Sequence, residues 1–112
     1  MQRFVKMLRL KPSVQAIELY KKAHDEIWPE IVEGIKAVGI TSMELYRYGY
    51  DMVMIMELPD NINVEQAMSD LSKLPRQDEW ENFVGQYQEC KEGDSSNDKW
   101  HSMEPLFSLA NH

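Results

Sequence analysis

The sequence predicts a single α+β domain, in which an antiparallel sheet packs against helices. Two observations predict this class. Segments with alternating apolar residues, typical of strands, are interspersed with segments whose apolar residues recur at helical spacing. The chain has 112 residues, 43% of them hydrophobic and 28% charged, which is the size and composition of one folded domain. We therefore expect residues 1–112 to form one domain with one core.

The first third of the chain predicts a strand and a long helix. We expect the strand over residues 3–10 and a helix that begins after Ser13 and ends at Gly39. Pro29 lies inside this helical stretch and has no backbone N–H to donate. The helix is therefore expected to kink or divide just before it, near Trp28.

The middle of the chain predicts a hairpin followed by two shorter helices. Residues 40–48 and 51–58 alternate in hydrophobicity around a turn at Gly49, which is typical of a β-hairpin. A helix is expected over residues 63–74, because Asn63 followed by Gln66 resembles a capping box. A second helical piece is expected over residues 78–88.

The end of the chain predicts a loop and a last strand. Residues 91–99 are rich in Gly, Ser, Asn and Asp and are expected to form a mobile loop. Residues 103–109 are the candidate last strand, and Pro105 suggests an edge position. The resulting order, β-α-β-β-α-β, is the ferredoxin-like plan.

Both faces of the predicted sheet are apolar. Alternation places Met52, Met54, Met56 and Leu58 on one side and Val53 and Ile55 on the other; it places Met43 and Leu45 opposite Ile40, Tyr46 and Tyr48. Helices in this plan cover one face only, so a second subunit or a ligand pocket should cover the other. We expect a homodimer, forming a dimeric α+β barrel, because symmetric dimers are the commonest assembly.

Charge and cysteine content exclude several functions. Nineteen acidic and twelve basic residues give a net charge of −7, so neither nucleic acid nor an anionic membrane surface is an expected partner. The single cysteine, Cys90, rules out an intrachain disulfide. We see no signal-peptide core and no apolar run of the roughly 20 residues that a membrane span needs, and we expect a cytoplasmic protein.

His24 is the strongest candidate for a catalytic residue. It falls in the middle of the apolar arc of the first helix, with Tyr20 four residues before it and Trp28 four residues after it. One interpretation is a hydrogen-bonded core histidine packed among aromatic rings. The other is a pocket in which the rings bind a sugar face and His24 transfers a proton near neutral pH.

Other chemistries have weaker support. No spacing of His, Cys or acidic residues is typical of a metal site, so no metal is expected. Cys90 adjoins an acidic stretch, which disfavours a catalytic thiolate. No glycine-rich phosphate loop is present.

One segment carries a family resemblance. The residues from Glu18 to Glu30 read ELYKKAHDEIWPE, and Tyr-x-x-x-His followed by Ile-Trp-Pro-Glu resembles the L-rhamnose mutarotase family. The likeness continues at Gly39, Tyr46, Trp80, Met103 and Phe107. It implies a ferredoxin-like dimer and a cofactor-free isomerase that interconverts the α and β anomers of a deoxyhexose.

The resemblance also implies roles for individual residues. His24 corresponds to the family's catalytic acid, Tyr20 to a sugar-binding tyrosine and Trp80 to a stacking platform. Two positions depart from the family pattern: Glu81 stands in place of a second tryptophan, and Met43 in place of a sugar-contacting tyrosine. We expect both to line the substrate site, with Tyr46 and Trp28 as further pocket candidates that could equally be core residues.

The departures leave the substrate open. L-rhamnose is the expected sugar and L-fucose the alternative, because a site that reads hydroxyl groups discriminates strongly when its polar groups change. A sugar-binding or regulatory module without catalysis is a second alternative. A cofactor-free monooxygenase is a third, because this architecture hosts unrelated functions.

Overall fold

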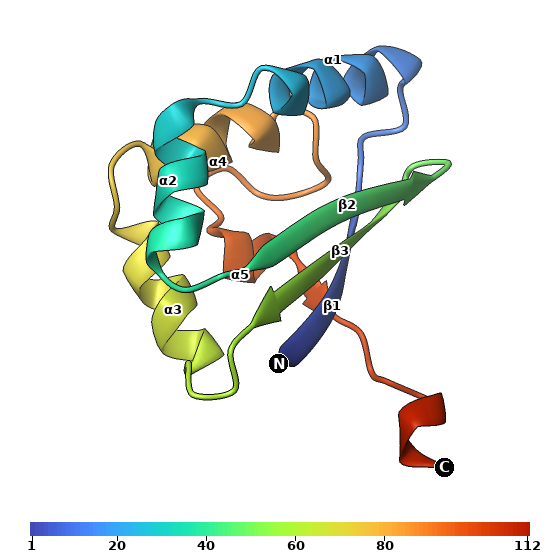
Figure 1. Cartoon of the computed structure of the whole chain (residues 1–112). Helices are drawn as coiled ribbons and strands as arrows, with labels where there is room; N and C mark the ends of the chain where they lie inside the picture. The colour runs from blue at the N-terminus through green and yellow to red at the C-terminus, as the bar shows by residue number, and fades with distance from the viewer.

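The computed structural model describes residues 1–112 and shows a four-stranded antiparallel sheet with its helices on one face (Figure 1). The strands are β1 Gln2–Arg9, β2 Ser42–Tyr48, β3 Asp51–Leu58 and β4 His101–Ser102. They lie in the order β2-β3-β1-β4, and every neighbouring pair is antiparallel. This arrangement confirms the predicted α+β, ferredoxin-like fold.

Five helices connect the strands, and local signals set their ends. They are α1 Val14–Asp25, α2 Pro29–Ala37, α3 Val64–Ser72, α4 Gln77–Gly85 and α5 Ser96–Lys99. The side chains of Ser13 and Asn63 accept hydrogen bonds from the first turns of α1 and α3, as predicted. Pro29 is the first residue of α2, so the expected long helix divides there.

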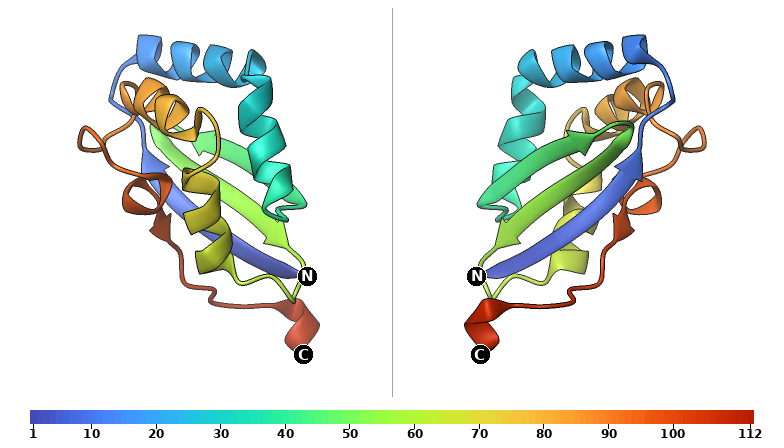
Figure 2. Two further views of the ribbon diagram at one scale, coloured as in Figure 1. Left: turned by 90° about the vertical axis from the view of Figure 1, so that its left-hand side faces the viewer. Right: turned by 90° about the vertical axis from the view of Figure 1, so that its right-hand side faces the viewer.

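The side chains of the central strand β3 alternate between the two faces of the sheet. Met52, Met54, Met56 and Leu58 are at most 6% exposed and pack under the helices. Val53 and Ile55 are half-buried on the opposite face, which no helix covers. The right-hand view of Figure 2 looks onto this bare face of the sheet. The one-sided arrangement expected from the sequence is therefore present.

The last strand is not where the sequence suggested. Residues 103–109 are not a strand; only His101 and Ser102 pair with β1, and the N–H of Met103 donates one further hydrogen bond to the Val5 carbonyl. Beyond it the chain extends away from the sheet to a short 3₁₀ turn at Leu109–Asn111, with Leu106 and Phe107 exposed (Figure 1). The reason is that β4 starts where buried Trp100 fixes the chain beside β1, two residues earlier than the local pattern suggested.

The segment 91–99 is only partly a loop. Its second half forms the short helix α5, whose cap residue Ser95 exchanges hydrogen bonds with Asp98 in a capping box. The side chain of Lys99 and the ring of Trp100 turn inward and are buried. The two residues therefore hold this segment against the helical layer.

Helices α2 and α4 pack together at Gly34 of α2, which leaves room for the buried side-chain amide of Gln77 on α4. Gln77 is only 5% exposed, and its side-chain Nε2 donates a hydrogen bond of 3.3 Å to the Ile31 carbonyl. A Cβ added at Gly34 would collide with this nitrogen. The absence of a side chain at Gly34 is thus what lets Gln77 reach the backbone of α2.

This contact predicts that Gly34→Ala destabilises the protein by about 1–2 kcal/mol, because Gln77 must leave its carbonyl partner. In a Gln77→Ala background the same change should instead stabilise by about 0.5–1 kcal/mol, because alanine favours a helix interior over glycine. Denaturant unfolding of the four proteins measures both effects. Equal effects of Gly34→Ala in the two backgrounds would contradict the predicted collision.

Candidate functional site

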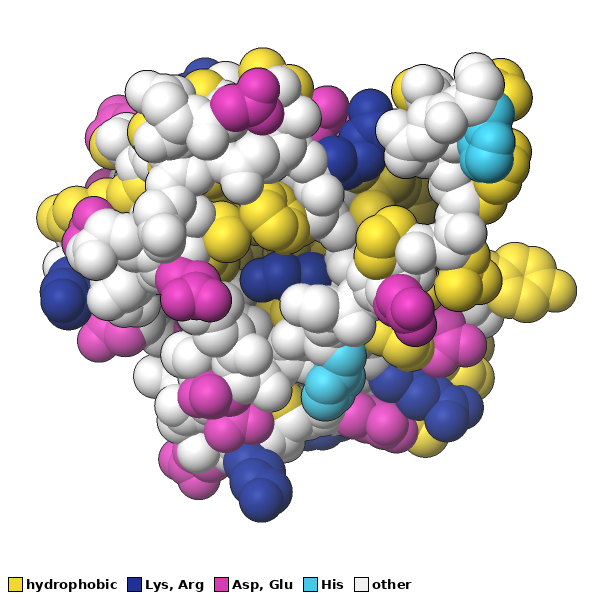
Figure 3. All heavy atoms as spheres, turned by 90° about the horizontal axis from the view of Figure 1, so that it is seen from below, with side chains coloured by type: hydrophobic (Ala, Val, Ile, Leu, Met, Phe, Trp, Pro, Cys, Tyr) yellow, Lys and Arg dark blue, Asp and Glu magenta, His cyan; other side chains and the backbone are white.

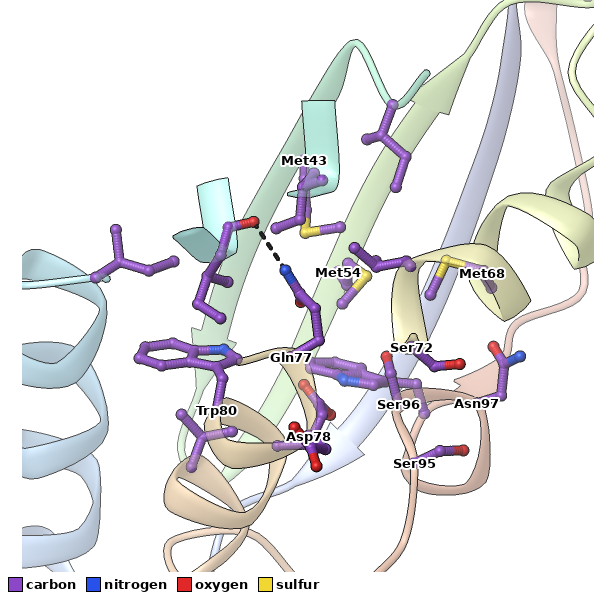
Figure 4. Close-up of a pocket in the computed structure, with 18 of the residues that line it drawn as sticks. Met43, Met54, Met68, Ser72, Gln77, Asp78, Trp80, Ser95, Ser96 and Asn97 are labelled. Atoms are coloured by element: carbon purple, nitrogen blue, oxygen red, sulfur yellow. Dashed lines mark hydrogen bonds between the residues drawn. The ribbon is translucent and has the colours of Figure 1, made fainter. Parts of the chain in front are cut away.

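A cavity of about 720 Å³ lies between the helices and the covered face of the sheet. Figure 4 shows its side chains: methionines from β2, β3 and α3, Gln77 and Trp80 from α4, and small polar residues around α5. Besides Gln77, its labelled polar residues are Ser72, Asp78, Ser95, Ser96 and Asn97. The cavity therefore combines an apolar wall with a polar rim, the usual composition of a small-molecule site.

His24 lines this cavity with a defined orientation of its ring. Its Nδ1 lies 2.9 Å from the carbonyl oxygen of Tyr20, one turn earlier in α1. A carbonyl oxygen only accepts, so Nδ1 carries the hydrogen and donates it. Nε2 is then the nitrogen that gains or loses a proton. The helix backbone thus fixes which end of the ring can do acid–base chemistry.

The surroundings of His24 favour its neutral form. Burial lowers the pKa of His24 below its ordinary value of 6.5, while the hydrogen bond to the Tyr20 backbone and the nearby Asp25 carboxylate raise it in part. A protonated His24 in this place is consequently a stronger acid than a histidine in water.

Tyr20 lies directly beside His24, as its position four residues earlier predicted. The ring centroids are 4.4 Å apart, and Tyr20 is 6% exposed. Its hydroxyl accepts a hydrogen bond of 3.3 Å from Nε2 of Gln88, which is 1% exposed. Burial raises the pKa of Tyr20 well above 10.0, so its hydroxyl stays protonated. The Oε1 atom of Gln88 is buried without a hydrogen-bond partner.

Trp80 completes an aromatic group around His24. Its ring centroid is 5.2 Å from that of His24 and 5.2 Å from that of Trp28, in edge-to-face geometry at both contacts. Trp80 lines the cavity, whereas Trp28 packs behind it, stacked on Phe83 and covered by the Arg76 guanidinium. The structure therefore places Trp80 in the cavity wall, and Trp28 packs against Trp80 outside the cavity.

The other expected site residues divide between the two faces of the sheet. Met43 and Glu81 line the cavity, as does Ile40, which the strand pattern had placed on the opposite face. Tyr46 does not: it is 54% exposed on the bare face, where its hydroxyl donates to the Glu44 carboxylate at 3.0 Å. The structure thus does not bring Tyr46 to the cavity of its own chain.

Sequence reasoning missed four buried residues: Gln77, Gln88 and Trp100, which line the cavity, and Lys99, which pairs with the cavity residue Glu81. Each is at most 6% exposed. The signal for Gln88 was weak, since a glutamine at a helix end normally faces water. Lys99 is the last residue of the segment 91–99 that composition marked as a loop, and Trp100 follows it directly.

No group of three or more His, Cys, Asp or Glu side chains is arranged to hold a metal ion. No helix combines the length and the apolar stretch needed to cross a bilayer.

Comparison with known proteins gives consistent matches. The family model described as L-rhamnose mutarotase matches residues 3–109. An L-fucose mutarotase of Xanthomonas campestris pv. campestris is 28% identical over 112 residues, covering 98% of this chain and 90% of the relative.

Solved structures share the fold. The L-rhamnose mutarotase of Formosa agariphila superposes with a TM-score of 0.76 at 15% identity, covering 97% of this chain and 99% of that chain. A dimeric ferredoxin-like protein from an uncultured marine organism superposes with a TM-score of 0.59 at 12% identity, covering 95% and 90%.

The orientation of His24 predicts its NMR titration. The neutral ring should carry its hydrogen on Nδ1, and its midpoint should lie below 6.5, because burial disfavours the charged ring. The unfolded chain then binds the proton first as pH falls through 6.5, so acidification through this window destabilises the fold. Long-range ¹H–¹⁵N spectra report both tautomer and midpoint.

A His24→Gln variant assigns the signals and should lose that part of the pH dependence of stability. A neutral ring protonated on Nε2, or a midpoint above 6.5, would show that the Tyr20 carbonyl does not hold the ring as described.

Proposed function

The chain belongs to the L-rhamnose mutarotase family, and from this premise we propose that it interconverts the α and β anomers of a 6-deoxyhexose. L-rhamnose is the first candidate substrate. L-fucose is the second, because the full-length match in Xanthomonas campestris is named an L-fucose mutarotase. The proposed enzyme is an isomerase that needs no cofactor, since ring opening moves protons and leaves oxidation states unchanged.

The observation that carries this proposal is the orientation of His24. Its Nδ1 is occupied by the Tyr20 carbonyl, and its Nε2 is available for proton exchange in a cavity large enough for a monosaccharide. Anomers exchange when an acid protonates the ring oxygen and a base removes the anomeric proton. In this proposal His24, when protonated, is the acid, and it recovers its proton when the ring closes on the other face.

The cavity walls suit the proposed substrate. A 6-deoxyhexose has one face of C–H groups and a methyl group, and Met43 and Trp80 offer apolar surface for them. Its hydroxyl groups need polar partners, and we assign that role to the Tyr20 hydroxyl, the Glu81 carboxylate and the polar rim. Trp28 is proposed to support Trp80 from behind, and Tyr46 to serve a different surface.

We propose that two copies of the chain associate through the bare face of the sheet. Val5, Met7, Val53 and Ile55 are half-buried there, and Tyr46 is exposed beside Val53. An apolar sheet face of this kind is typically covered by a partner, and a symmetric dimer would use the same face of both copies. We also propose a cytoplasmic location, since a chain with the single cysteine Cys90 has no disulfide framework that would call for an oxidising compartment.

Saturation-transfer NMR of anomeric exchange, run on L-rhamnose, L-fucose and D-galactose, tests the activity. Wild-type protein should accelerate exchange of one 6-deoxyhexose. His24→Gln should lower kcat by about 10²–10⁴-fold while sugar affinity changes little, because it removes proton transfer and leaves the walls intact.

The matched control is His101→Gln, which changes an exposed histidine outside the cavity and should behave like wild type. Full exchange by His24→Gln would contradict the assignment. Sugar binding without exchange by the wild type would favour a binding module, and oxygen consumption with an aromatic substrate would favour a monooxygenase.

The assembly proposal predicts a particle of two chains of 13.2 kDa each in light scattering. Ile55→Glu should convert it to a monomer with an unchanged circular dichroism spectrum, because a charge would be buried in the interface. Val14→Glu changes an exposed apolar residue on α1, on the helical side, and should stay dimeric. A dimer that persists with Ile55→Glu would exclude the bare face as the interface.

A further inference from the structure

A buried ion pair forms part of the wall of the cavity. Glu81 follows Trp80 in α4, lines the cavity with Tyr20 and His24, and has a side chain that is 23% exposed. Its Oε1 is buried and has no hydrogen-bond partner, but it lies 3.4 Å from the Nζ atom of Lys99. The charge of Lys99 thus holds Oε1, and the protein gives no hydrogen bond to Oε2, which leaves that oxygen to accept one from a ligand.

The position of Lys99 is set by two helices. Its side chain is only 2% exposed, and its Nζ also donates a hydrogen bond to the backbone carbonyl of Glu81. It passes over Gly85, where an added Cβ would come within 3.3 Å of Nζ. Lys99 itself does not line the cavity, so it can act on a ligand only through Glu81.

The surroundings bring the proton affinities of Glu81 and His24 closer together. Burial raises the pKa of Glu81 above 4.5, and the Lys99 ammonium opposes this rise. Burial lowers the pKa of His24 below 6.5. The other titratable or charged groups around the two are Tyr20 and Asp25 on α1, Lys36 on α2, Asp78 on α4, Cys90 after α4, and Asp94 before α5. Burial therefore makes Glu81 a stronger base and His24 a stronger acid than the same side chains in water.

This inference rests on the proposed mutarotase function: we propose that Glu81 is the second catalytic residue, the base that exchanges a proton with the anomeric hydroxyl, and that Lys99 is its positioning residue. The Glu81 carboxylate takes the O1 proton while protonated His24 donates from Nε2 to the ring oxygen. The C1–O5 bond breaks as the C1–O1 bond becomes a carbonyl. After rotation about C1–C2, both protons return and C1–O5 forms on the other face. No net proton is gained or lost.

A purely structural role is the competing explanation. The pair also fastens α5 to α4, and loss of a buried charge partner destabilises a protein. The two roles differ in their pH dependence. A catalytic Glu81 produces a bell-shaped rate profile with an acid limb from Glu81 and an alkaline limb from His24, whereas a structural pair leaves only the limb of His24.

The test is the pH profile of kcat and KM for anomeric exchange of L-rhamnose and L-fucose. Glu81→Gln should lower kcat about 100-fold or more with a small change in KM, and should abolish the acid limb. Lys99→Met keeps the aliphatic stem but removes the charge, so it should shift the acid limb to higher pH. Lys99→Arg should restore part of the wild-type profile. Glu79→Gln, an exposed change on the same helix, is the control expected to match wild type.

The outcomes distinguish a failure of the proposed mutarotase function from a failure of the roles proposed for Glu81 and Lys99. Absence of exchange by the wild type overturns the proposed function and this inference together. Wild-type exchange with an unaltered Glu81→Gln profile overturns only the role of Glu81. Loss of rate in Lys99→Met without movement of the acid limb overturns the positioning role of Lys99.

A measurement on the wild type covers the case in which the variants do not fold. The ¹³C signal of the Glu81 carboxyl should titrate above 4.5 and should shift when sugar saturates the site. A signal that is insensitive to sugar would overturn the proposal without any substitution.

Discussion

The alternation of side chains along β3 is the constraint on which the rest of the molecule depends. Because β3 lies between β1 and β2, its four buried residues Met52, Met54, Met56 and Leu58 form the centre of the covered sheet face. The helices must span this face, and α1 and α2 do so as two segments divided at Pro29. Where the helices do not fill the space above the sheet, the cavity remains. The same strand directs Val53 and Ile55 to the bare face, so one pattern accounts for both the site and the proposed interface.

Buried polar side chains fix the helices around this cavity. Gln77 reaches the backbone of α2, Gln88 reaches the hydroxyl of Tyr20 on α1, and Lys99 reaches Glu81. Each joins elements that are distant in sequence, and an unsatisfied group of this kind is costly in a low-dielectric interior. The helices are therefore held in position by directional contacts at the cavity wall, where an apolar contact alone would allow them to slide. This rigidity is what a proton-transfer site requires.

Local signals predicted much of this arrangement. The caps at Ser13 and Asn63, the break at Pro29 and the adjacency of Tyr20 and His24 all follow from neighbours within four residues. The expected strand over residues 103–109 was wrong because pairing depends on a partner strand and on where Trp100 is buried, which no local pattern reveals. Gln88 and Lys99 were missed for the same reason: their partners lie 68 and 18 residues away. Tyr46 stays a prediction for the substrate site, but it does not line the cavity of its own chain, because it lies three residues from Met43 on β2 and residues three apart on a strand point to opposite faces.

The methionine-rich wall of the cavity bears on how this fold could change its substrate. Met43, Met54 and Met68 have unbranched, flexible side chains that adapt to the shape beside them. In the proposed mutarotase, such a wall would adapt to several hydroxyl epimers of a sugar without moving the backbone, so shape would contribute little to their discrimination. Selectivity then depends on the few polar groups that face the cavity. In the proposed enzyme, a new sugar preference would therefore require only one or two polar substitutions on an unchanged scaffold.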